Sequence, residues 1–546
     1  MASITESESR ARFLPGDRFD AVVVGAGFAG LYMLHRLRGA GFSARVFEAA
    51  PTVGGTWYWN RYPGARCDIE SMQYSYQFSE ELQQDWEWTE RFASQPEILA
   101  YIEHVAERFD LKRDIQFDTR VDGATFDEEN DEWVVRTDAG QTVRARYLIL
   151  GTGCLSATNT PHFEGYGDFR GAIYHTGNWP QDGVDFTGKR VGVIGTGSSA
   201  VQAVPLIAEE AAHLYVFQRT PNFVVPAQNR PLDPDEVASL KADYRGFRDR
   251  AKQRPTAFLF PFHTDSALEV SDEERKARFE AQWKIGGLPF LGAFGDLLTS
   301  EESNRTIAEF WRGKIREIVK DPAVADLLTP DPDDIFGCKR LCAGTDYYET
   351  YNRPNVTLVD VSGTGIERFT PAGLRAAGQD FDLDAIVCAT GFDAMTGSLT
   401  RMNIVGKSGL TISDKWAGGA RNYIGVSIAG FPNMFNMAGP GSPSVLATMV
   451  TCIEQHGDWI ADCMDWMREN GRTRIEATEQ AETAWVNEVN AAASGSLRST
   501  CNSWYVGSNI PGKAHVFMPY IGGFPKYVEK CEAVAANGYE GFETRS

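Results

Sequence analysis

Long apolar runs are missing from this sequence. No stretch approaches the roughly 18 consecutive apolar residues that a membrane-spanning helix needs. The first ten residues are polar and acidic, without the apolar core of a signal peptide. These two absences argue against a membrane or secreted protein, and we expect a soluble protein located in the cytoplasm.

Positive charge is also scarce. The 546 residues contain 53 Lys and Arg against 74 Asp and Glu, which gives a net charge of −21. Nucleic acids and anionic membranes are bound through basic surfaces, so we expect neither as a partner. The remaining composition, 43% hydrophobic and 23% charged, is that of an ordinary globular protein with two or three domains.

Cysteine is sparse and scattered. The nine cysteines are odd in number and predict no disulfide framework, so we expect reduced thiols. The closest pair is Cys338 and Cys342, and no His or Cys cluster around them has the spacing of a zinc site. No metal ion is expected.

Two glycine motifs carry the positive signal. The first is Gly25-Ala-Gly27-Phe28-Ala-Gly30 after the apolar run 21–24, and the second is Gly195-Thr196-Gly197-Ser198-Ser199-Ala200 after 191–194. Each lies between a strand-like and a helix-like segment. There the glycines permit a tight turn and bring the backbone close to a pyrophosphate at the helix N-terminus. Each motif therefore predicts a dinucleotide-binding βαβ unit.

The two motifs differ at the position that contacts the ribose, 23 residues after the first glycine. The first count reaches Glu48, an acid placed to accept a hydrogen bond from a ribose hydroxyl. The second reaches Gln218, followed by Arg219. A carboxylate repels a 2′-phosphate, whereas arginine binds one through charge-assisted hydrogen bonds. The first site is therefore predicted to bind FAD and the second NADP(H).

The rest of the pattern predicts the domain organisation. Apolar strands at 145–150 and 384–391 lead into Thr-Gly sequences, as in strands that close a dinucleotide-binding domain. Helix caps at 233–234 and 271–274, and apolar residues at helical spacing over 307–318, predict helices between them. We expect an α/β fold with two Rossmann-like domains. The FAD-binding domain comprises 1–155 and 391–546, the NADP-binding domain comprises 156–228 and 334–390, and a helical insertion occupies 229–333.

A longer motif lies between the two glycine motifs. The segment Phe169-Arg-Gly171-Ala-Ile-Tyr-His175-Thr-Gly-Asn-Trp179-Pro180 resembles the signature F-x-G-x-x-x-H-x-x-x-W-P of type I Baeyer–Villiger monooxygenases at every specified position. A second signature of that family is matched by Gly54-Gly55-Thr56-Trp57, Tyr62-Pro63-Gly64 and Asp68. Further matches at 339–340, 389–392, 502–505 and 509–512 extend the resemblance over nearly the whole chain.

The resemblance implies a flavoenzyme supplied with electrons by NADPH. In this family FAD and O₂ form a C4a-peroxyflavin that attacks a ketone, and the Criegee intermediate rearranges to an ester or lactone. Arg340 matches the arginine that stabilises the negative charge, and Asp68 matches the acid that pairs with it. Gly55, Thr56, Trp57 and Asp68 are implied to line the FAD site. A ketone and O₂ are the implied reactants, and we expect a monomer.

The resemblance also assigns the nicotinamide nucleotide site. Arg219, Thr220 and Lys339 match residues that bind the 2′-phosphate, and Arg340 is expected to border NADP(H) as well. Trp504 matches a tryptophan whose indole N–H binds the nucleotide. The signature residues Phe169, Gly171, His175 and Trp179 are implied to form a linker that couples domain rotation to cofactor state. Cys154 departs from the family pattern near the flavin.

Three other functions fit part of the pattern. A flavin monooxygenase that oxidises sulfur or nitrogen shares both glycine motifs, but its signature lacks the ending Trp179-Pro180. A pyridine nucleotide–disulfide reductase has a Cys-x₄-Cys pair soon after the flavin motif, whereas Cys67 stands alone. A non-catalytic NADP-responsive binding protein has no use for the set Asp68, Arg340 and Trp504. The sequence therefore predicts a Baeyer–Villiger monooxygenase, with sulfur or nitrogen oxidation as the alternative.

Overall fold

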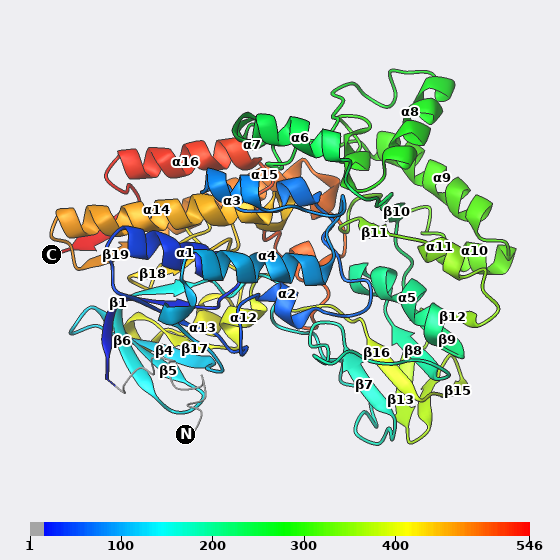
Figure 1. The fold of residues 1–546 in the computed structure, drawn as a ribbon, viewed down its shortest axis with the longest axis horizontal. Coiled ribbons are helices and arrows are strands. Elements are labelled where there is room, and N and C mark those ends of the chain that lie inside the picture. Colours follow the sequence, from blue (N-terminus) through cyan, green and yellow to red (C-terminus); the bar gives the residue numbers. More distant parts are fainter. Residues whose placement is uncertain (1–15) are drawn as a thin grey trace, which may run out of the picture.

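Two sheets organise the chain, and each contains one glycine motif at the end of a central strand (Figure 1). The computed structural model describes residues 16–546. The polar N-terminal segment, from which we expect no signal peptide, lies outside this range. Within it, no helix combines the length and apolarity that crossing a membrane requires. The architecture is the predicted α/β fold with two Rossmann-like units.

The first sheet has eight strands in the order β17-β4-β5-β6-β1-β2-β3, and β18 also pairs with β6. Strands β6, β1 and β2 are parallel, whereas β4, β5 and β6 form an antiparallel meander. Strands β17 and β18 add in parallel to β4 and β6, so the C-terminal third of the chain returns to this sheet. The strands are β1 (Arg18–Val24), β2 (Ala44–Phe47), β3 (Ile115–Gln116), β4 (Val121–Asp127), β5 (Glu132–Thr137), β6 (Thr142–Leu150), β17 (Asn403–Val405) and β18 (Met434–Asn436).

The last four residues of strand β1 are apolar and buried, as expected for a central parallel strand that is covered on both faces. Helix α1 (Phe28–Gly39) follows it and packs on α14 (Met449–Glu469), where the Tyr32 hydroxyl donates to Asp458 at 2.7 Å. Figure 1 shows α4, α14, α15 and α16 on the same side of the first sheet as α1. The other helices of this half are α2 (Thr56–Trp59), α3 (Glu80–Asp85), α4 (Gln95–Arg108), α12 (Gly397–Thr400), α13 (Ile412–Lys415), α15 (Glu479–Ser494) and α16 (Phe524–Ala536).

The second sheet is parallel throughout, in the order β12-β9-β8-β16-β7. Its strands are β7 (Ala172–His175), β8 (Arg190–Ile194), β9 (His213–Gln218), β12 (Val356–Asp360) and β16 (Ala385–Cys388), and α5 (Ser198–Glu210) follows β8. The segment expected to be a linker is therefore partly an edge strand, because residues 172–175 form β7. The backbone donors of β7 pair with β16, and this pairing fixes the signature to the second sheet.

The segment between β9 and β12 is mainly helical. Its helices are α6 (Pro234–Ala242), α7 (Tyr244–Lys252), α8 (Asp272–Ile285), α9 (Glu301–Ile318) and α10 (Pro322–Leu328), followed by α11 (Tyr347–Thr350). Both predicted caps are confirmed: the side chain of Asp233 accepts from two N–H groups of α6, and that of Ser271 accepts from Glu274. Trp311 of α9 is fully buried. The strands β10 (Val224–Pro226) and β11 (Cys342–Gly344) pair in parallel beside this segment.

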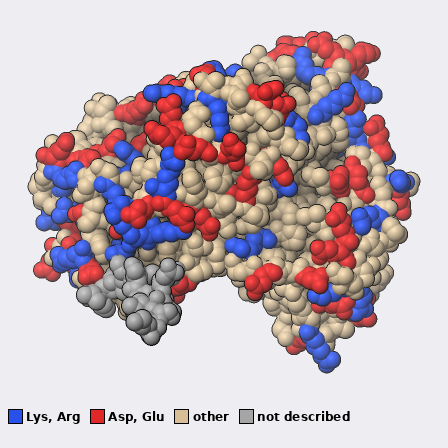
Figure 2. All heavy atoms as spheres, viewed as in Figure 1, with Lys and Arg blue, Asp and Glu red and all other residues tan. Residues whose placement is uncertain are grey.

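Two small antiparallel sheets complete the fold. They are formed by β13 (Ile366–Thr370), β14 (Gly373–Ala376) and β15 (Gln379–Asp382), and by β19 (Arg474–Ala477) and β20 (Phe542–Arg545). On the outer surface, acidic and basic side chains are interspersed over the face shown in Figure 2. Many of them pair, as Arg36 does with Asp458 at 2.7 Å.

Candidate active site

A single large cleft connects the two glycine motifs. Its volume is about 1940 Å³, well above the roughly 300–1,000 Å³ of a site for one drug-sized molecule. It is therefore large enough for two dinucleotides and a substrate. The predicted residues that line it are Gly25, Gly27, Phe28, Glu48, Gly55, Thr56, Trp57, Asp68, Gly195, Thr196, Gly197, Ser198, Ser199, Arg219, Thr220, Lys339, Arg340 and Trp504.

The first glycine motif leaves no room for side chains. Gly25 has φ +99°, and a Cβ there would lie 2.7 Å from the carbonyl oxygen of Gly151. A Cβ on Gly30 would lie only 1.7 Å from the oxygen of Gly25, so Gly30 packs α1 onto β1 and does not line the cleft. Gly27 similarly touches Gly55, where a Cβ would fall 2.9 Å from the Gly27 Cα. Because these positions have no side chains, the backbone of the motif can come close to a cofactor.

Glu48 lies in the cleft wall and is 5% exposed. Its carboxylate accepts hydrogen bonds from the backbone N–H groups of Ala26 at 2.6 Å and Ala50 at 2.8 Å. Burial raises its pKa, and the two hydrogen bonds oppose that rise. The acid therefore also fixes the turn of the first glycine motif. A carboxylate has about four acceptor positions, so it retains capacity for a ribose hydroxyl.

The second glycine motif is built in the same way. Gly195 has φ +118°, and a Cβ there would lie 2.5 Å from the carbonyl oxygen of Ala389. The Thr196 hydroxyl donates to the carbonyl oxygen of Thr220 at 2.7 Å, which ties the motif to the segment after Arg219. Gln218 is buried and donates to the Leu327 carbonyl, so it faces away from the cleft, whereas Arg219 lines it. Arg219 therefore brings a positive charge to the cleft beside the second glycine motif.

Arg340 and Asp68 meet where the two halves of the cleft join. The guanidinium Nε donates to Oδ2 of Asp68 at 2.6 Å, and a terminal nitrogen donates to Oδ1 at 2.8 Å. The other terminal nitrogen donates to the Val445 carbonyl at 2.8 Å. Burial disfavours the cation, but the charge and hydrogen bonds of Asp68 outweigh it and raise the pKa of Arg340 well above its usual value. Arg340 is therefore a permanent, fixed positive charge in the cleft.

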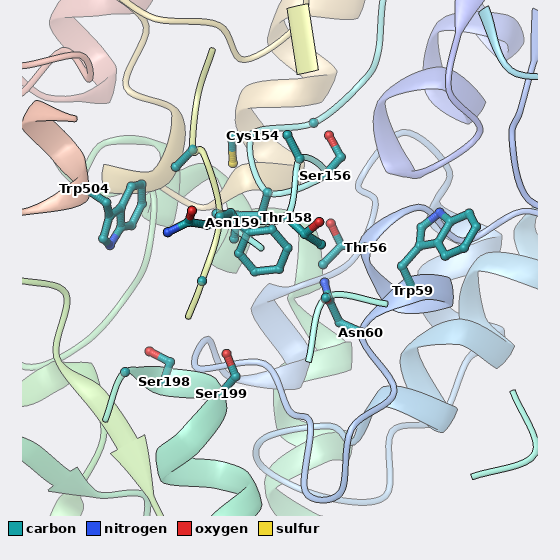
Figure 3. Close-up of a pocket in the computed structure, with 18 of the residues that line it drawn as sticks. Thr56, Trp59, Asn60, Cys154, Ser156, Thr158, Asn159, Ser198, Ser199 and Trp504 are labelled. Carbon is teal, nitrogen blue, oxygen red and sulfur yellow. The ribbon is translucent and has the colours of Figure 1, made fainter. Parts of the chain in front are cut away.

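Aromatic and apolar side chains border this charge. Figure 3 shows Trp504 and Trp59 on opposite sides of the opening, with Ser198 and Ser199 at its lower edge. The ring of Trp504 lies against that of Tyr505, with their centroids 4.3 Å apart and their planes tilted by 40°. The lining also includes Cys154, Leu155, Val445, Met449 and Ile453. Burial raises the pKa of the Cys154 thiol to about 11, so this departure from the family pattern adds a neutral, weakly polar group.

The signature histidine lies outside the cleft lining. His175 Nδ1 accepts from the N–H of Gly177 at 3.0 Å, which places the proton on Nε2, within 3.2 Å of the Thr390 hydroxyl oxygen. Burial lowers the pKa of His175. The other signature residues also pack: Trp179 is buried, Phe169 meets Phe369 edge-on, and Gly171 leaves no room for a Cβ beside Asp384. Both ring nitrogens of this neutral histidine have hydrogen-bond partners within the second half of the molecule. This arrangement supports a structural role for His175 and not a role in proton transfer.

The expectation that all cysteines are reduced is wrong for one pair. Cys338 and Cys501 form a disulfide across a sequence separation of 163, and the seven other cysteines are free. The bond joins the residue before Lys339-Arg340 to the loop that leads to Trp504. The bond could not be predicted from the sequence, because two isolated cysteines at long separation carry no spacing signal. Gln202 also lines the cleft, although its sequence context is that of an ordinary helix residue.

Comparison with known proteins identifies the family. Residues 22–246 match the family described as pyridine nucleotide-disulphide oxidoreductase. A Baeyer-Villiger monooxygenase of Pseudooceanicola batsensis is 45% identical over 528 residues, which covers 96% of each chain. The chain belongs to the Baeyer–Villiger monooxygenase family.

Two further relatives are similar to this chain over nearly its whole length. The solved structure of an oxidized steroid monooxygenase bound to NADP is 54% identical, covers 96% of this chain and 99% of that chain, and superposes with a TM-score of 0.92. A phenazine N-monooxygenase of Lysobacter antibioticus is 42% identical over 528 residues, again 96% of each chain. Proteins named a steroid monooxygenase and a phenazine N-monooxygenase are thus both similar to this chain over 96% of its length.

Proposed function

We propose that this protein is an FAD-dependent Baeyer–Villiger monooxygenase that uses NADPH and O₂ to convert a ketone into an ester or lactone. One oxygen atom enters between the carbonyl carbon and a neighbouring carbon, and the other leaves as water, while NADPH and a proton are consumed. The observation that carries the proposal is the bidentate Arg340–Asp68 ion pair between the two dinucleotide sites. It supplies a fixed cation where a carbonyl oxygen gains negative charge.

The residues of the two glycine motifs fit the two cofactors. FAD would lie along Gly25, Gly27 and Phe28 and against Gly55, Thr56 and Trp57. NADP(H) would lie on Gly195–Ser199, with its 2′-phosphate at Arg219, Thr220 and Lys339 and its nicotinamide end toward Trp504. When bound, NADPH supplies the hydride and FAD supplies the activated oxygen. The N-terminus of α5 supports this placement, since its free N–H groups and positive dipole end favour a pyrophosphate.

Arg340 stabilises the negative charge that forms on the substrate. A guanidinium has five N–H groups, and three of the five of Arg340 are committed to Asp68 and Val445. The remaining two are free to donate to the carbonyl oxygen when its carbon becomes tetrahedral. Because Asp68 and Val445 hold the guanidinium in place, no reorganisation is needed during the reaction, and such preorganised charge is usually the largest catalytic term.

The apolar wall beside Arg340 supports an uncharged substrate. Leu155, Val445, Met449 and Ile453 would contact the hydrocarbon part of a ketone, and the neutral Cys154 thiol adds no charge. The proposal also includes the domain boundaries given above, a monomeric state and a cytoplasmic location.

Oxidation of nitrogen or sulfur is the second candidate function. The similarity to a phenazine N-monooxygenase over 96% of both chains favours it. Oxygen transfer to a nitrogen or sulfur lone pair develops no oxyanion on the substrate, so it needs no cation beside a carbonyl. The Arg340–Asp68 pair therefore favours ketone oxidation as the main reaction.

One experiment separates the two candidates. The purified yellow protein is mixed with NADPH in air and offered phenylacetone, cyclic and steroid ketones, a thioether and an aromatic N-heterocycle, and the products are identified by mass spectrometry. The proposal predicts an ester or lactone from at least one ketone, such as benzyl acetate from phenylacetone, with NADPH preferred to NADH. Formation of only sulfoxides or N-oxides would contradict it.

A further inference from the structure

His456 is a fully buried histidine on α14 that does not line the cleft. Its Nδ1 accepts a hydrogen bond from the backbone N–H of Ala438 at 2.8 Å. The proton of the neutral ring is therefore on Nε2, which donates to the hydroxyl oxygen of Tyr527 at 2.6 Å. The Tyr527 hydroxyl donates in turn to the backbone carbonyl of Ile424 at 2.5 Å. Two buried side chains, the His456–Tyr527 pair, thus join two backbone positions through three hydrogen bonds.

Both of these backbone positions are strained. Ala438 has φ +53° and Ile424 has φ +44°, in the left-handed region that side chains, and β-branched ones above all, rarely adopt. Such strain persists only where the surrounding contacts over-determine it, and the His456–Tyr527 pair supplies a contact at each position. Burial lowers the pKa of His456 to about 3, so the ring stays neutral and its hydrogen bonds keep their direction at ordinary pH.

Segment 438–445 begins at Ala438 and ends beside Arg340. The carbonyl oxygen of Ala438 accepts from the Ser444 hydroxyl at 3.0 Å, so the start and the end of the segment are joined. Ser444 is itself fully buried and has φ +44°. The next carbonyl, that of Val445, accepts from Arg340 at 2.8 Å. Direct contacts therefore lead from the buried histidine through Ala438 and Ser444 to the guanidinium.

The middle of segment 438–445 is held independently. Gly425 has φ +69°, and a Cβ there would lie 2.6 Å from the backbone nitrogen of Ser442. The indole N–H of Trp485 donates to the carbonyl of Gly441 at 3.0 Å. Loss of the hydrogen bonds of the His456–Tyr527 pair should therefore loosen the start of the segment without unfolding it.

We propose that His456 and Tyr527 are positioning residues for ketone oxidation, which hold Ala438 in its left-handed conformation and so place the Val445 carbonyl that fixes Arg340. Neither side chain lines the cleft, so the pair acts through Arg340 and not by touching the substrate. The inference rests on the proposed function, because ester formation is the reaction that needs a fixed Arg340.

The test uses the FAD-loaded protein with Tyr527→Phe, His456→Asn and His456→Leu. Phenylalanine keeps the ring of Tyr527 and removes only its hydroxyl. Asparagine places an acceptor oxygen close to the position of Nδ1, so it can keep the hydrogen bond from Ala438, whereas leucine cannot. Tyr351→Phe is the matched control, since Tyr351 is also buried and donates to another buried tyrosine hydroxyl at 2.9 Å.

The kcat for ester formation should fall about tenfold to a hundredfold in Tyr527→Phe and His456→Leu, as expected when a preorganised group is displaced. Hydrogen peroxide should account for the NADPH that no longer yields ester, while the FAD content and the KM for NADPH keep their parent values. His456→Asn should recover most of the rate lost in His456→Leu. Backbone amide hydrogen exchange over 438–446 should be faster in Tyr527→Phe and unchanged in Tyr351→Phe.

A double-mutant cycle shows whether the His456–Tyr527 pair acts through Arg340. If it does, Tyr527→Phe adds little to the loss of ester formation already caused by Arg340→Ala. Multiplicative losses would overturn the proposal, and so would an unchanged kcat in Tyr527→Phe or equal losses in His456→Asn and His456→Leu. If the parent protein forms no ester from any ketone, the proposed function fails together with the inference. That outcome is distinct from equal ester formation by the parent and by Tyr527→Phe, which overturns the inference alone.

Discussion

The guanidinium Nε of Arg340 lies 2.6 Å from the carboxylate of Asp68, although 272 residues separate them in the chain. Asp68 follows the first glycine motif, and Arg340 stands two residues before β11, next to the second. The pair therefore forms only when the two halves of the cleft are docked. A half-buried guanidinium without a partner is costly, so this contact links the docking of the halves to the charge that the reaction needs.

Arg219 is predicted to distinguish NADPH from NADH. In Arg219→Ala the KM for NADPH should rise about tenfold to a hundredfold, because one charge-assisted hydrogen-bonding group is lost, whereas the KM for NADH should barely change. Steady-state kinetics with both nucleotides measure the ratio. Arg305→Ala, which alters an exposed arginine of α9, serves as the control. Equal losses for both nucleotides would refute the assignment of the 2′-phosphate site.

Gly30 and Gly39 offer a matched pair within α1. A Cβ on Gly30 would lie 1.7 Å from the oxygen of Gly25, whereas nothing lies within 4 Å of a Cβ on Gly39. Gly30→Ala should lose FAD and lower the free energy of unfolding by about 1–3 kcal/mol or more, since helix and strand are forced apart. Gly39→Ala should retain FAD and be neutral or stabilising by up to about 1 kcal/mol. Visible spectra and urea unfolding report both. FAD retained at full occupancy in Gly30→Ala would show that the motif tolerates the extra carbon.

The Cys338–Cys501 disulfide determines how many thiols should react in the denatured protein. Denatured protein should give seven reactive thiols without reductant and nine after reduction, as seven cysteines are free. Loss of the bond in Cys501→Ser should lower the free energy of unfolding by about 2–5 kcal/mol and weaken NADP⁺ binding, because the loop before Trp504 is released. Disulfides are uncommon in reduced cytosol, so the count also bears on the proposed location. Nine thiols without reductant would contradict the cross-link.

The buried carboxylate of Glu454 should make the free energy of unfolding depend on pH. Its carboxylate is buried on α14 and accepts from the N–H groups of Gln77 and Phe78 at 2.7 and 2.9 Å. Burial is the main cause that raises its pKa from 4.5 to about 7. The folded protein then binds more protons than the unfolded chain between these values, so the contribution of this group falls as pH rises through that window, by at most about 3 kcal/mol.

Glu454→Gln should remove that slope. The amide keeps an acceptor oxygen and does not titrate, so the variant should gain stability over the parent at pH 8 and differ little at pH 4.5. Urea unfolding at the two pH values measures the difference. Glu529→Gln, at an exposed position of α16, should leave the slope unchanged. An unchanged slope in Glu454→Gln would show that folding does not raise the pKa of Glu454.

The local parts of this fold could be predicted from sequence. Both βαβ units follow from glycines whose positive φ angles are a local requirement of the turn, as at Gly25 and Gly195. The caps at Asp233 and Ser271 are local in the same sense. The pairing of Asp68 with Arg340 came only from the family resemblance, because nothing in either segment encodes the other.

Contacts made by docking were missed. The Cys338–Cys501 bond and the Gln202–Arg66 pairing join segments 163 and 136 residues apart. Glu48 was expected to contact a ribose, and its second function, binding the N–H of Ala26, depends on turn geometry that the residue types alone do not show. The Baeyer–Villiger signature segment was expected to be a linker. Its residues 172–175 instead form an edge strand, because they pair in parallel with β16.

The most direct test of the central claim is the product formed by Arg340→Ala. The variant should keep FAD and still oxidise NADPH, but the rate of ester formation from the best ketone should fall at least about a hundredfold, as when a preorganised oxyanion donor is removed. Hydrogen peroxide should account for the NADPH consumed. Arg340→Lys should recover part of the rate, since it keeps the charge but not the two-point contact with Asp68. Ester formation by Arg340→Ala at the parent rate would contradict the account.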